Sequence, residues 1–259
     1  MNLTNQVALV TGAGQGIGKA AALALSAAGA HVVAADIAMP KAAATADAIM
    51  SLQRRALAVQ ADVGDLANID RMVRQSLENF GQIDILVNNA GVTRRADIME
   101  LTEEDWDSIH RVNAKGVFFC LQRVAREMIP RRSGRIINIA SIAGKGYAGA
   151  SNAAYAASKG AVISLTKTAA QQLGKHNINV NSVCPGVTRT ALSDANLHVR
   201  AQQEGVTPQE MEQRRASVIP LQRVNDPEDI AAMVVFLASA GARNITGQSF
   251  NVDGGLIPD

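Results

Sequence analysis

The chain has 259 residues and a formal net charge of +2 at pH 7. This length suits one domain with a large core, and the balanced charge without a basic stripe argues against nucleic acid as a partner. The first residues carry neither a basic start nor a long apolar run, so we expect no signal peptide and no membrane anchor. Cys120 and Cys184 lie far apart in apolar contexts, as reduced thiols of a cytoplasmic protein do. The four histidines show no ligand spacing, so no catalytic metal is expected.

Short apolar runs alternate with helical patterns along the whole chain. Seven runs predict strands, at residues 6–12, 31–36, 56–63, 83–91, 134–141, 178–186 and 248–255. Most are nearly continuous in apolar residues, which is typical of strands buried on both faces of a parallel sheet. Helices are predicted between them, starting near Gly16, Pro40, Asp65, Thr102, Asn152 and Asp226. The alternation predicts a single α/β domain over 1–259, with a doubly wound parallel sheet and helices on both faces.

The first predicted strand ends in a glycine-rich turn, TGAGQGIG, which leads into a helix. Gly12, Gly16 and Gly18 would let the backbone approach a pyrophosphate, and the helix N-terminus offers N–H groups and a positive dipole end. The strict G-x-G-x-x-G spacing is absent, but the turn follows the first strand of an alternating α/β chain. We therefore predict a dinucleotide site, which also includes Gln15 and Ile17 of the same turn.

Asp36 ends the second predicted strand, where a carboxylate can accept both ribose hydroxyls of NAD and would repel the 2′-phosphate of NADP. The neighbouring Gln15 and Ile37 are uncharged, and Lys19 and Lys41 are the only cations nearby. A surface aspartate at a strand end is the ordinary alternative. The pattern favours NAD over NADP.

The next two strand ends predict the rest of the adenosine site. Asp62 and Val63 follow the third strand and would hold the adenine edge, and Asn89 in the run NNAG would lie against the adenosine. These positions share the carboxyl edge of the sheet, where doubly wound folds bind their ligands.

The stretch from Ser141 to Lys159 predicts the chemistry. On a helix, Tyr155 and Lys159 are neighbours at i and i+4. A phenol titrates near ~10, and an adjacent ammonium is expected to lower the pKa of Tyr155 by favouring the phenolate. Ser141 ends the fifth strand and could donate a hydrogen bond to the same substrate oxygen. Taken singly, such residues are usually surface or turn residues. Together they predict proton transfer with an alcohol or a carbonyl. The other tyrosine of the chain, Tyr147, is expected to line the pocket.

Taken in order, the motifs cover the whole chain: TGAGQGIG, Asp36, NNAG, Asn113, Ser141, YAASK and PGVTRT. The sequence thereby resembles the single-domain short-chain dehydrogenases/reductases. The resemblance implies a sheet ordered 3-2-1-4-5-6-7, hydride transfer to or from NAD(P), and often a tetramer. Between Ser141 and Tyr155 there is one residue more than in the bacterial acyl-carrier ketoreductases of the family, so the loop between them is particular to this chain.

The resemblance also implies a role for each site residue. Tyr155 is the general acid/base, and Ser141 polarises the substrate oxygen. Lys159 lowers the pKa of Tyr155 and holds the nicotinamide ribose, and Asn113 ties Lys159 to a chain of waters. In PGVTRT, the Thr188 backbone and the Thr190 hydroxyl grip the nicotinamide carboxamide; all of these residues are carried over by position.

The segment 188–221 is polar and weakly patterned, and it is expected to form a helical lid over the substrate. Thr207 and Pro208 predict a capped helix start within it. Arg94, Arg95 and Lys145 are expected near the pocket mouth, where they would suit a hydroxylated or anionic substrate. The alternative is that the segment 188–221 and these three cationic side chains belong to the solvated surface and do not contact the substrate.

The function expected is NAD-linked interconversion of a secondary alcohol and its ketone, with a slight preference for a polyol or diol. The alternative is an NADPH-dependent reductase of 3-oxoacyl thioesters carried on acyl carrier protein or coenzyme A. A nucleotide sensor is disfavoured because the tetrad Asn113, Ser141, Tyr155 and Lys159 is complete. An epimerase or dehydratase is disfavoured because no substrate domain follows the sheet.

The small residues in the helix that begins near Asn152 do not decide the oligomeric state of the protein. They would pack equally well on the sheet or against a second copy, and only the resemblance favours a homotetramer. They are Ala153, Ala154, Ala157, Gly160, Ala161 and Ala169.

Overall fold

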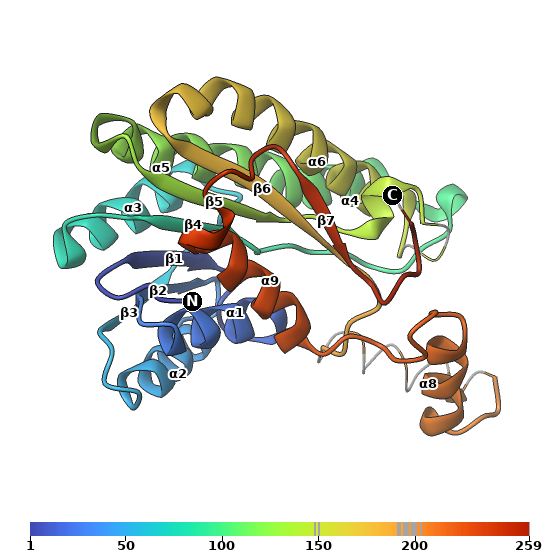
Figure 1. Cartoon of the computed structure of the whole chain (residues 1–259). Helices are drawn as coiled ribbons and strands as arrows, with labels where there is room; N and C mark the ends of the chain where they lie inside the picture. The colour runs from blue at the N-terminus through green and yellow to red at the C-terminus, as the bar shows by residue number, and fades with distance from the viewer. Residues whose placement is uncertain are drawn as a thin grey trace.

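The structure is a computed structural model that describes residues 1–258 except 148, 150, 191, 192, 194–196, 198–200 and 203. Seven parallel strands form one sheet in the order β3-β2-β1-β4-β5-β6-β7, which confirms the expected topology (Figure 1). Each strand lies within a run predicted from the sequence. The strands are β1 (Val7–Thr11), β2 (His31–Asp36), β3 (Ala56–Gln60), β4 (Ile85–Asn88), β5 (Gly134–Ile139), β6 (Ile178–Pro185) and β7 (Ser249–Val252).

Helices cover both faces of this sheet (Figure 1). One face carries α1 (Gly16–Ala27), α2 (Met39–Met50) and α9 (Pro227–Ala238). The other carries α3 (Leu66–Phe80), α4 (Glu103–His110), α5 (Val117–Arg131) and α6 (Ala153–Leu173). Because side chains alternate along a strand, Ala8 and Val10 of β1 join the first core and Leu9 joins the second.

Four of the six predicted helix starts carry side-chain caps. Asp65 and Asn152 each accept a hydrogen bond from a backbone N–H in the first turn of their helix. Thr102 and Asp226 form capping boxes. The helix that begins after Thr102 is interrupted, however, because α4 and α5 are joined by a π-helical segment, Arg111–Gly116.

The lid segment contains a further helix, α8 (Pro208–Ser217), with a capping box made by Thr207 and Glu210. Figure 1 shows α8 set apart from the main body. The remainder of the expected lid includes positions 191, 192, 194–196, 198–200 and 203, which lie outside the described residues. Within the part of the chain that the structure describes, no helix is long and apolar enough to cross a membrane, and no group of three potential metal ligands occurs.

Candidate active site

The turn between β1 and α1 requires glycine at several positions. A Cβ atom on Gly18 would lie 2.1 Å from the carbonyl oxygen of Gly12, and Gly12 and Gly16 have φ values of +64° and +53°. Gln15 is the N-cap of α1, but its side chain makes no capping hydrogen bond. The first amides of α1 can therefore bind a ligand, and the tight backbone fits a diphosphate.

Asp36 is fixed at the end of β2 by two backbone donors. Its Oδ2 accepts from the N–H of Gly14 and its Oδ1 from the N–H of Ala38, both at 2.9 Å. A Cβ on Gly14 would lie 2.8 Å from Oδ2 of Asp36, so glycine is needed here too, a role that the sequence pattern missed. Beside it, the Lys41 ammonium donates to Oε1 of Gln15 at 2.7 Å.

These groups open into a cavity of about 420 Å³ at the carboxyl edge of the sheet. Its lining includes most of the residues predicted for the dinucleotide, namely Gly12, Gln15, Gly16, Ile17, Asp36, Asp62, Val63, Asn89 and Thr190. Gly18 is not part of this lining but lies close behind Gly12, because an added Cβ there would be 2.1 Å from the Gly12 carbonyl oxygen. Most of the predicted cofactor residues therefore surround one space.

Two of these residues also make hydrogen bonds within the protein that the sequence did not predict. Asn89 donates through Nδ2 to the carbonyl oxygens of Thr11 and Gly12, at 3.0 and 3.1 Å, so its amide holds the glycine turn. Asp62 accepts from Nη1 of Arg111 at 2.8 Å. Burial raises the pKa of Asp62, but hydrogen bonds from Arg111 and the Gly64 N–H outweigh it and leave the pKa below its usual value.

Arg111 also lines the cofactor cavity, and the sequence analysis missed it. Nothing in the sequence pairs it with a carboxylate 49 positions away. Its guanidinium lies against Gly64 at the edge of this cavity.

A smaller cavity, of about 230 Å³, joins Ser141, Tyr155 and Lys159 to Thr188 and Thr190. Three of the four predicted catalytic side chains therefore line one space, and the fourth, Asn113, is not part of its lining. The N-cap residue Asn152 accepts from the N–H of Tyr155 at 2.7 Å, which fixes the start of the helix that carries the phenol. Lys159 is buried; its ammonium lies 5.7 Å from the centre of the Tyr155 ring and donates to the carbonyl oxygen of Ile139 at 2.7 Å.

The ionisation of this pair differs from the prediction. Burial raises the pKa of Tyr155, and a hydrogen bond with Ser141 only partly opposes that effect. Burial also lowers the pKa of Lys159 to about 8. The expected lowering of the Tyr155 pKa is thus wrong for the protein without cofactor, because the loss of solvation outweighs the hydrogen bond with Ser141.

Asn113 lies in the π-helical segment and is fully buried. Its Oδ1 accepts from the N–H of Val92 at 2.8 Å, and its Nδ2 donates to the carbonyl oxygen of Val92 and to Oγ of Ser158. A Cβ on Gly91 would lie 3.3 Å from Oδ1 of Asn113 and 3.6 Å from Nζ of Lys159. The two polar groups therefore face the same small space, and the water relay through Asn113 stays a prediction.

The turn after β6 carries the two threonines that were predicted to bind the nicotinamide carboxamide. A Cβ on Gly186 would lie 2.6 Å from Cβ of Asp253, which explains the glycine. Thr188 donates to the Gly186 carbonyl at 3.1 Å, and Oγ1 of Thr190 accepts from the N–H of Ser193 at 3.2 Å. Both threonines line the small cavity beside Tyr155.

A third cavity, of about 590 Å³, extends from Ser141 and Tyr155 to the loop after β4 and to α8. Tyr147, Arg94 and Arg95 line it, as expected. Lys145 does not; its ammonium donates to the carbonyl oxygen of Ser249 in β7. That expectation was wrong because the loop turns Lys145 toward the edge strand.

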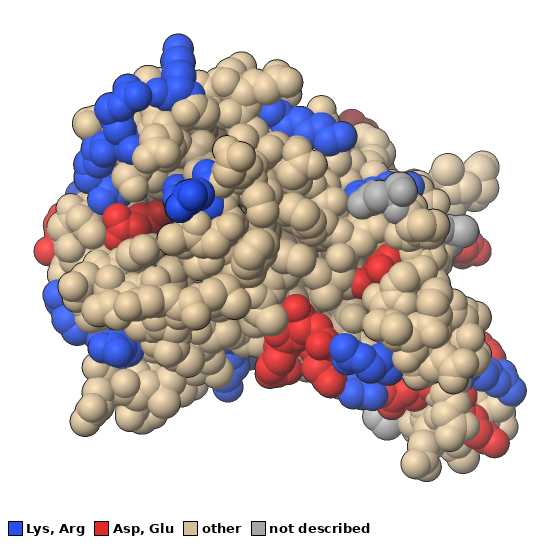
Figure 2. All heavy atoms as spheres, in the orientation of Figure 1, with Lys and Arg blue, Asp and Glu red and all other residues tan. Residues whose placement is uncertain are grey.

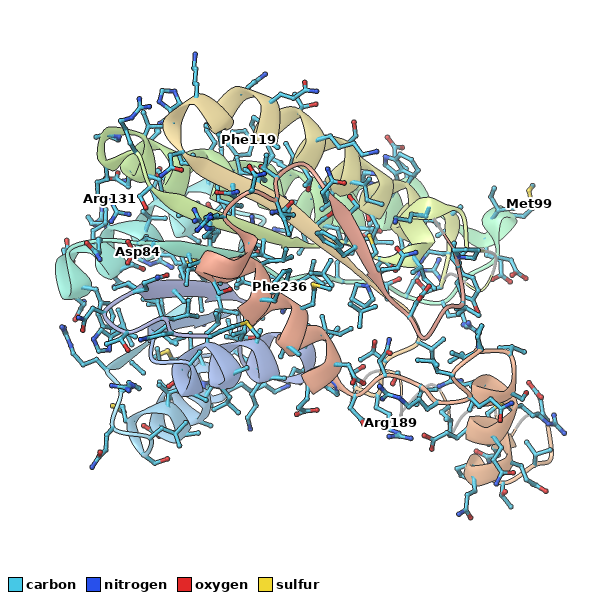
Figure 3. All side chains as sticks on the ribbon, in the orientation of Figure 1. Asp84, Met99, Phe119, Arg131, Arg189 and Phe236 are labelled. Carbon is cyan, nitrogen blue, oxygen red and sulfur yellow. The ribbon has the colours of Figure 1, made fainter. Side chains whose placement is uncertain are left out.

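The lid is tied to the body through Arg189, labelled in Figure 3 between α8 and α9. Arg189 forms ion pairs with Glu212 of α8 and with the α9 cap Asp226. Figure 2 shows acidic and basic side chains side by side in this region. A larger, open hollow of about 860 Å³ lies on the outer face of α4 and contains none of the predicted site residues, so we assign the active site to the three connected cavities.

Comparisons with known proteins agree with this geometry. A family model described as enoyl-(acyl carrier protein) reductase matches residues 12–257. A 3-oxoacyl-[acyl-carrier-protein] reductase of Synechocystis sp. is 41% identical over 261 residues, with 98% of both chains covered. The chain belongs to the short-chain dehydrogenases/reductases. As a member of this family it is an oxidoreductase that acts on CH–OH groups.

Other relatives of this short-chain dehydrogenase/reductase carry different substrate names. A galactitol 2-dehydrogenase of Agrobacterium fabrum is 45% identical over 259 residues, with 98% of both chains covered. The structure of an NAD⁺-bound xylitol dehydrogenase superposes with a TM-score of 0.91 at 30% identity, covering 98% of this chain and 100% of that one.

Proposed function

We propose that this chain interconverts a secondary alcohol and its ketone with NAD(H). The observation that carries the proposal is the continuity of the site: Ser141, Tyr155 and Lys159 line a cavity that shares Ile17, Asn89 and other residues with the dinucleotide cavity. A proton-transfer group and a dinucleotide cleft therefore adjoin.

The residues that would hold the dinucleotide are distributed along the carboxyl edge of the sheet. The α1 amides would bind the diphosphate, Asp36 the adenosine ribose, and Thr188 and Thr190 the carboxamide. When bound, the nicotinamide supplies the hydride acceptor for the carbinol C–H bond.

The protein's own residues manage the proton. The Tyr155 phenolate accepts the hydroxyl proton as the carbonyl forms, and in the reverse direction the phenol returns it. Ser141 donates a hydrogen bond to the same oxygen and holds it near the phenol. The buried ammonium of Lys159 stabilises the phenolate once the site is complete.

NAD is preferred in this proposal because both oxygens of Asp36 already accept backbone hydrogen bonds, which keeps the carboxylate at the ribose position. A 2′-phosphate would approach this negative charge closely. The main alternative is an NADPH-dependent 3-oxoacyl thioester reductase. One observation favours it: the Lys41 ammonium stands at Gln15 on the rim of the same cavity.

We also propose that the protein works in the cytoplasm as a homotetramer. Ala154, Ala169 and Ala170 of α6 are buried, whereas Ala153, Ala157 and Ala161 are exposed along one side of the helix. Such a row of small exposed residues permits close packing of a second helix.

The test is nicotinamide absorbance with a panel of polyols, other secondary alcohols, hydroxy acids and 3-hydroxyacyl thioesters, each with NAD and with NADP. We expect turnover of one alcohol class with NAD and slow turnover with NADP. Turnover of acyl thioesters with NADP, at rates above those of the NAD reactions, would establish the alternative.

A further inference from the structure

The segment between α8 and α9 pairs with the turn that follows β6. Asn225 of this segment forms an isolated parallel bridge with Thr188. The N–H of Asn225 donates to the carbonyl oxygen of Val187 at 2.8 Å, and the N–H of Arg189 donates to the carbonyl oxygen of Asn225 at 2.8 Å. Two stretches that are distant in the sequence are thereby held side by side, next to the ends of β6 and β7 (Figure 1).

This bridge fixes the direction of the Thr188 backbone. In a parallel pair, one residue bonds to the two neighbours of the residue opposite, whose own N–H and C=O groups point to the other side. Asn225 bonds in this way to Val187 and Arg189, the two neighbours of Thr188. The backbone groups of Thr188 therefore point away from Asn225, and Thr188 also lines the small cavity that holds Tyr155.

The side chain of Asn225 attaches this bridge to the sheet. Asn225 is buried, and its Nδ2 donates to the carbonyl oxygen of Val252 at 2.7 Å. Val252 is the last residue of β7, and the same carbonyl oxygen accepts from the N–H of Gly186 at 2.9 Å. One carbonyl group therefore holds both the start of the turn after β6 and the residue that bridges to Thr188.

The backbone around this anchor is closely packed. A Cβ on Gly186 would lie 2.6 Å from Cβ of Asp253, and a Cβ on Gly254 would lie 2.5 Å from Cγ2 of Ile219. The N–H of Leu221 donates to the carbonyl oxygen of Gly254 at 3.1 Å. The turn after β7 therefore lies against both the turn after β6 and the segment before α9, and the three segments move together or lose these contacts.

We infer that Asn225 is a positioning residue for the nicotinamide half of the cofactor. Through its hydrogen bond to the end of β7, it holds the bridge that orients the Thr188 backbone, and this backbone would bind the carboxamide. The inference rests on the proposed function and extends it to a residue that lines neither of the two cofactor cavities. The diphosphate and the adenosine ribose would be held elsewhere, at the start of α1 and at Asp36, so the effect of Asn225 is confined to one half of the cofactor.

The experiment compares NADH with ADP-ribose, which lacks only the nicotinamide ring. Calorimetry measures the dissociation constant of each ligand for the wild type, Asn225→Ala and Asn225→Leu. Leucine keeps the approximate size of asparagine but cannot donate to Val252, whose carbonyl oxygen retains its bond from Gly186. We expect the dissociation constant of NADH to rise about tenfold in both variants, the effect of losing one hydrogen bond, and that of ADP-ribose to stay unchanged.

Asn179→Ala is the matched control. Asn179 is also a buried asparagine, and its Nδ2 donates to the carbonyl oxygens of Arg243 and Ile245, at 3.1 and 2.8 Å. It lies near the start of β6, at the opposite end of this strand from the turn that carries Thr188. Asn179→Ala should lower the stability measured by urea unfolding, as Asn225→Ala does, but keep the wild-type ratio of the two dissociation constants.

Two results would overturn the inference. One is an unchanged dissociation constant of NADH in the folded Asn225 variants, and the other is an equal loss of affinity for NADH and ADP-ribose. Asn225→Leu decides the outcome if urea unfolding shows that Asn225→Ala does not fold. Either result, together with alcohol oxidation by the wild type, would refute only the role of Asn225. Selective loss of NADH affinity without oxidation of any alcohol by the wild type would refute the proposed function and keep that role.

Discussion

At the scale of single residues, the ionisation of Tyr155 depends on what surrounds it. Burial raises the pKa of this phenol above its ordinary value of 10.0, and Lys159, whose own pKa falls to about 8, does not reverse that. Burial therefore favours the protonated form of Tyr155 in the protein without cofactor. A nicotinamide cation beside the ring would add positive charge and favour the phenolate.

We accordingly predict that NAD⁺ lowers the pH at which Tyr155 ionises. Ultraviolet difference absorbance reports phenolate, and Tyr155→Phe allows the signal of Tyr147 to be subtracted. The titration should move to lower pH in the NAD⁺ complex than in the free protein. An ionisation of Tyr155 below pH 10 without cofactor, or the same midpoint in both states, would refute the prediction.

At the scale of elements, the glycine turn is limited by contact distances. A Cβ on Gly18 would meet the Gly12 carbonyl at 2.1 Å and the Asn89 amide at 2.4 Å, so the turn must shift. We predict that Gly18→Ala abolishes NADH binding and lowers the free energy of unfolding by about 1–3 kcal/mol, as overpacking does. Fluorescence titration with NADH and urea unfolding measure the two effects.

Gly174→Ala is the matched control for that substitution. Gly174 has a φ of −57°, and an added Cβ would meet nothing within 4 Å. It should bind NADH normally and unfold at the wild-type urea concentration or slightly above it. Normal NADH binding in Gly18→Ala would show that the turn does not hold the diphosphate.

At the scale of the whole molecule, the exposed alanine row on α6 predicts assembly. Ala157 lies in the middle of this row. An arginine there keeps the helix intact and obstructs close packing, so Ala157→Arg should convert a tetramer into smaller species. Light scattering measures the mass, and Ala44→Arg, at an exposed alanine of α2, should leave it unchanged. A monomeric wild type, or an unchanged tetramer in Ala157→Arg, would contradict the assignment.

The sequence predicts those parts of the molecule whose interactions are local or repetitive. The buried strands follow from continuous apolar runs, and the caps at Thr102 and Asp226 follow from side chains that reach only three residues ahead. Contacts between distant positions could not be predicted in this way. The Asp62–Arg111 pair spans 49 positions, and the bond from Lys145 to Ser249 spans 104.

The pKa of Tyr155 likewise depends on contacts between distant positions and could not be predicted from the sequence. Its spacing from Lys159 is visible in the sequence, and the predicted proximity is confirmed. The depth at which both groups are buried depends on the whole fold, and this burial decides the direction of the shift. The spacing of the candidate catalytic residues is therefore predictable, whereas the energetics of their ionisation require the packed structure.

The most direct test of the central claim is the turnover of Tyr155→Phe with the preferred alcohol and NAD. Removing the hydroxyl should lower kcat by on the order of 10²–10⁴-fold, the contribution of general acid–base catalysis, while NADH binding stays intact. Tyr147→Phe, which removes the other phenol of the chain, should keep most of its activity with the same cofactor. Wild-type kcat in Tyr155→Phe would contradict the assignment of Tyr155 as the group that transfers the proton.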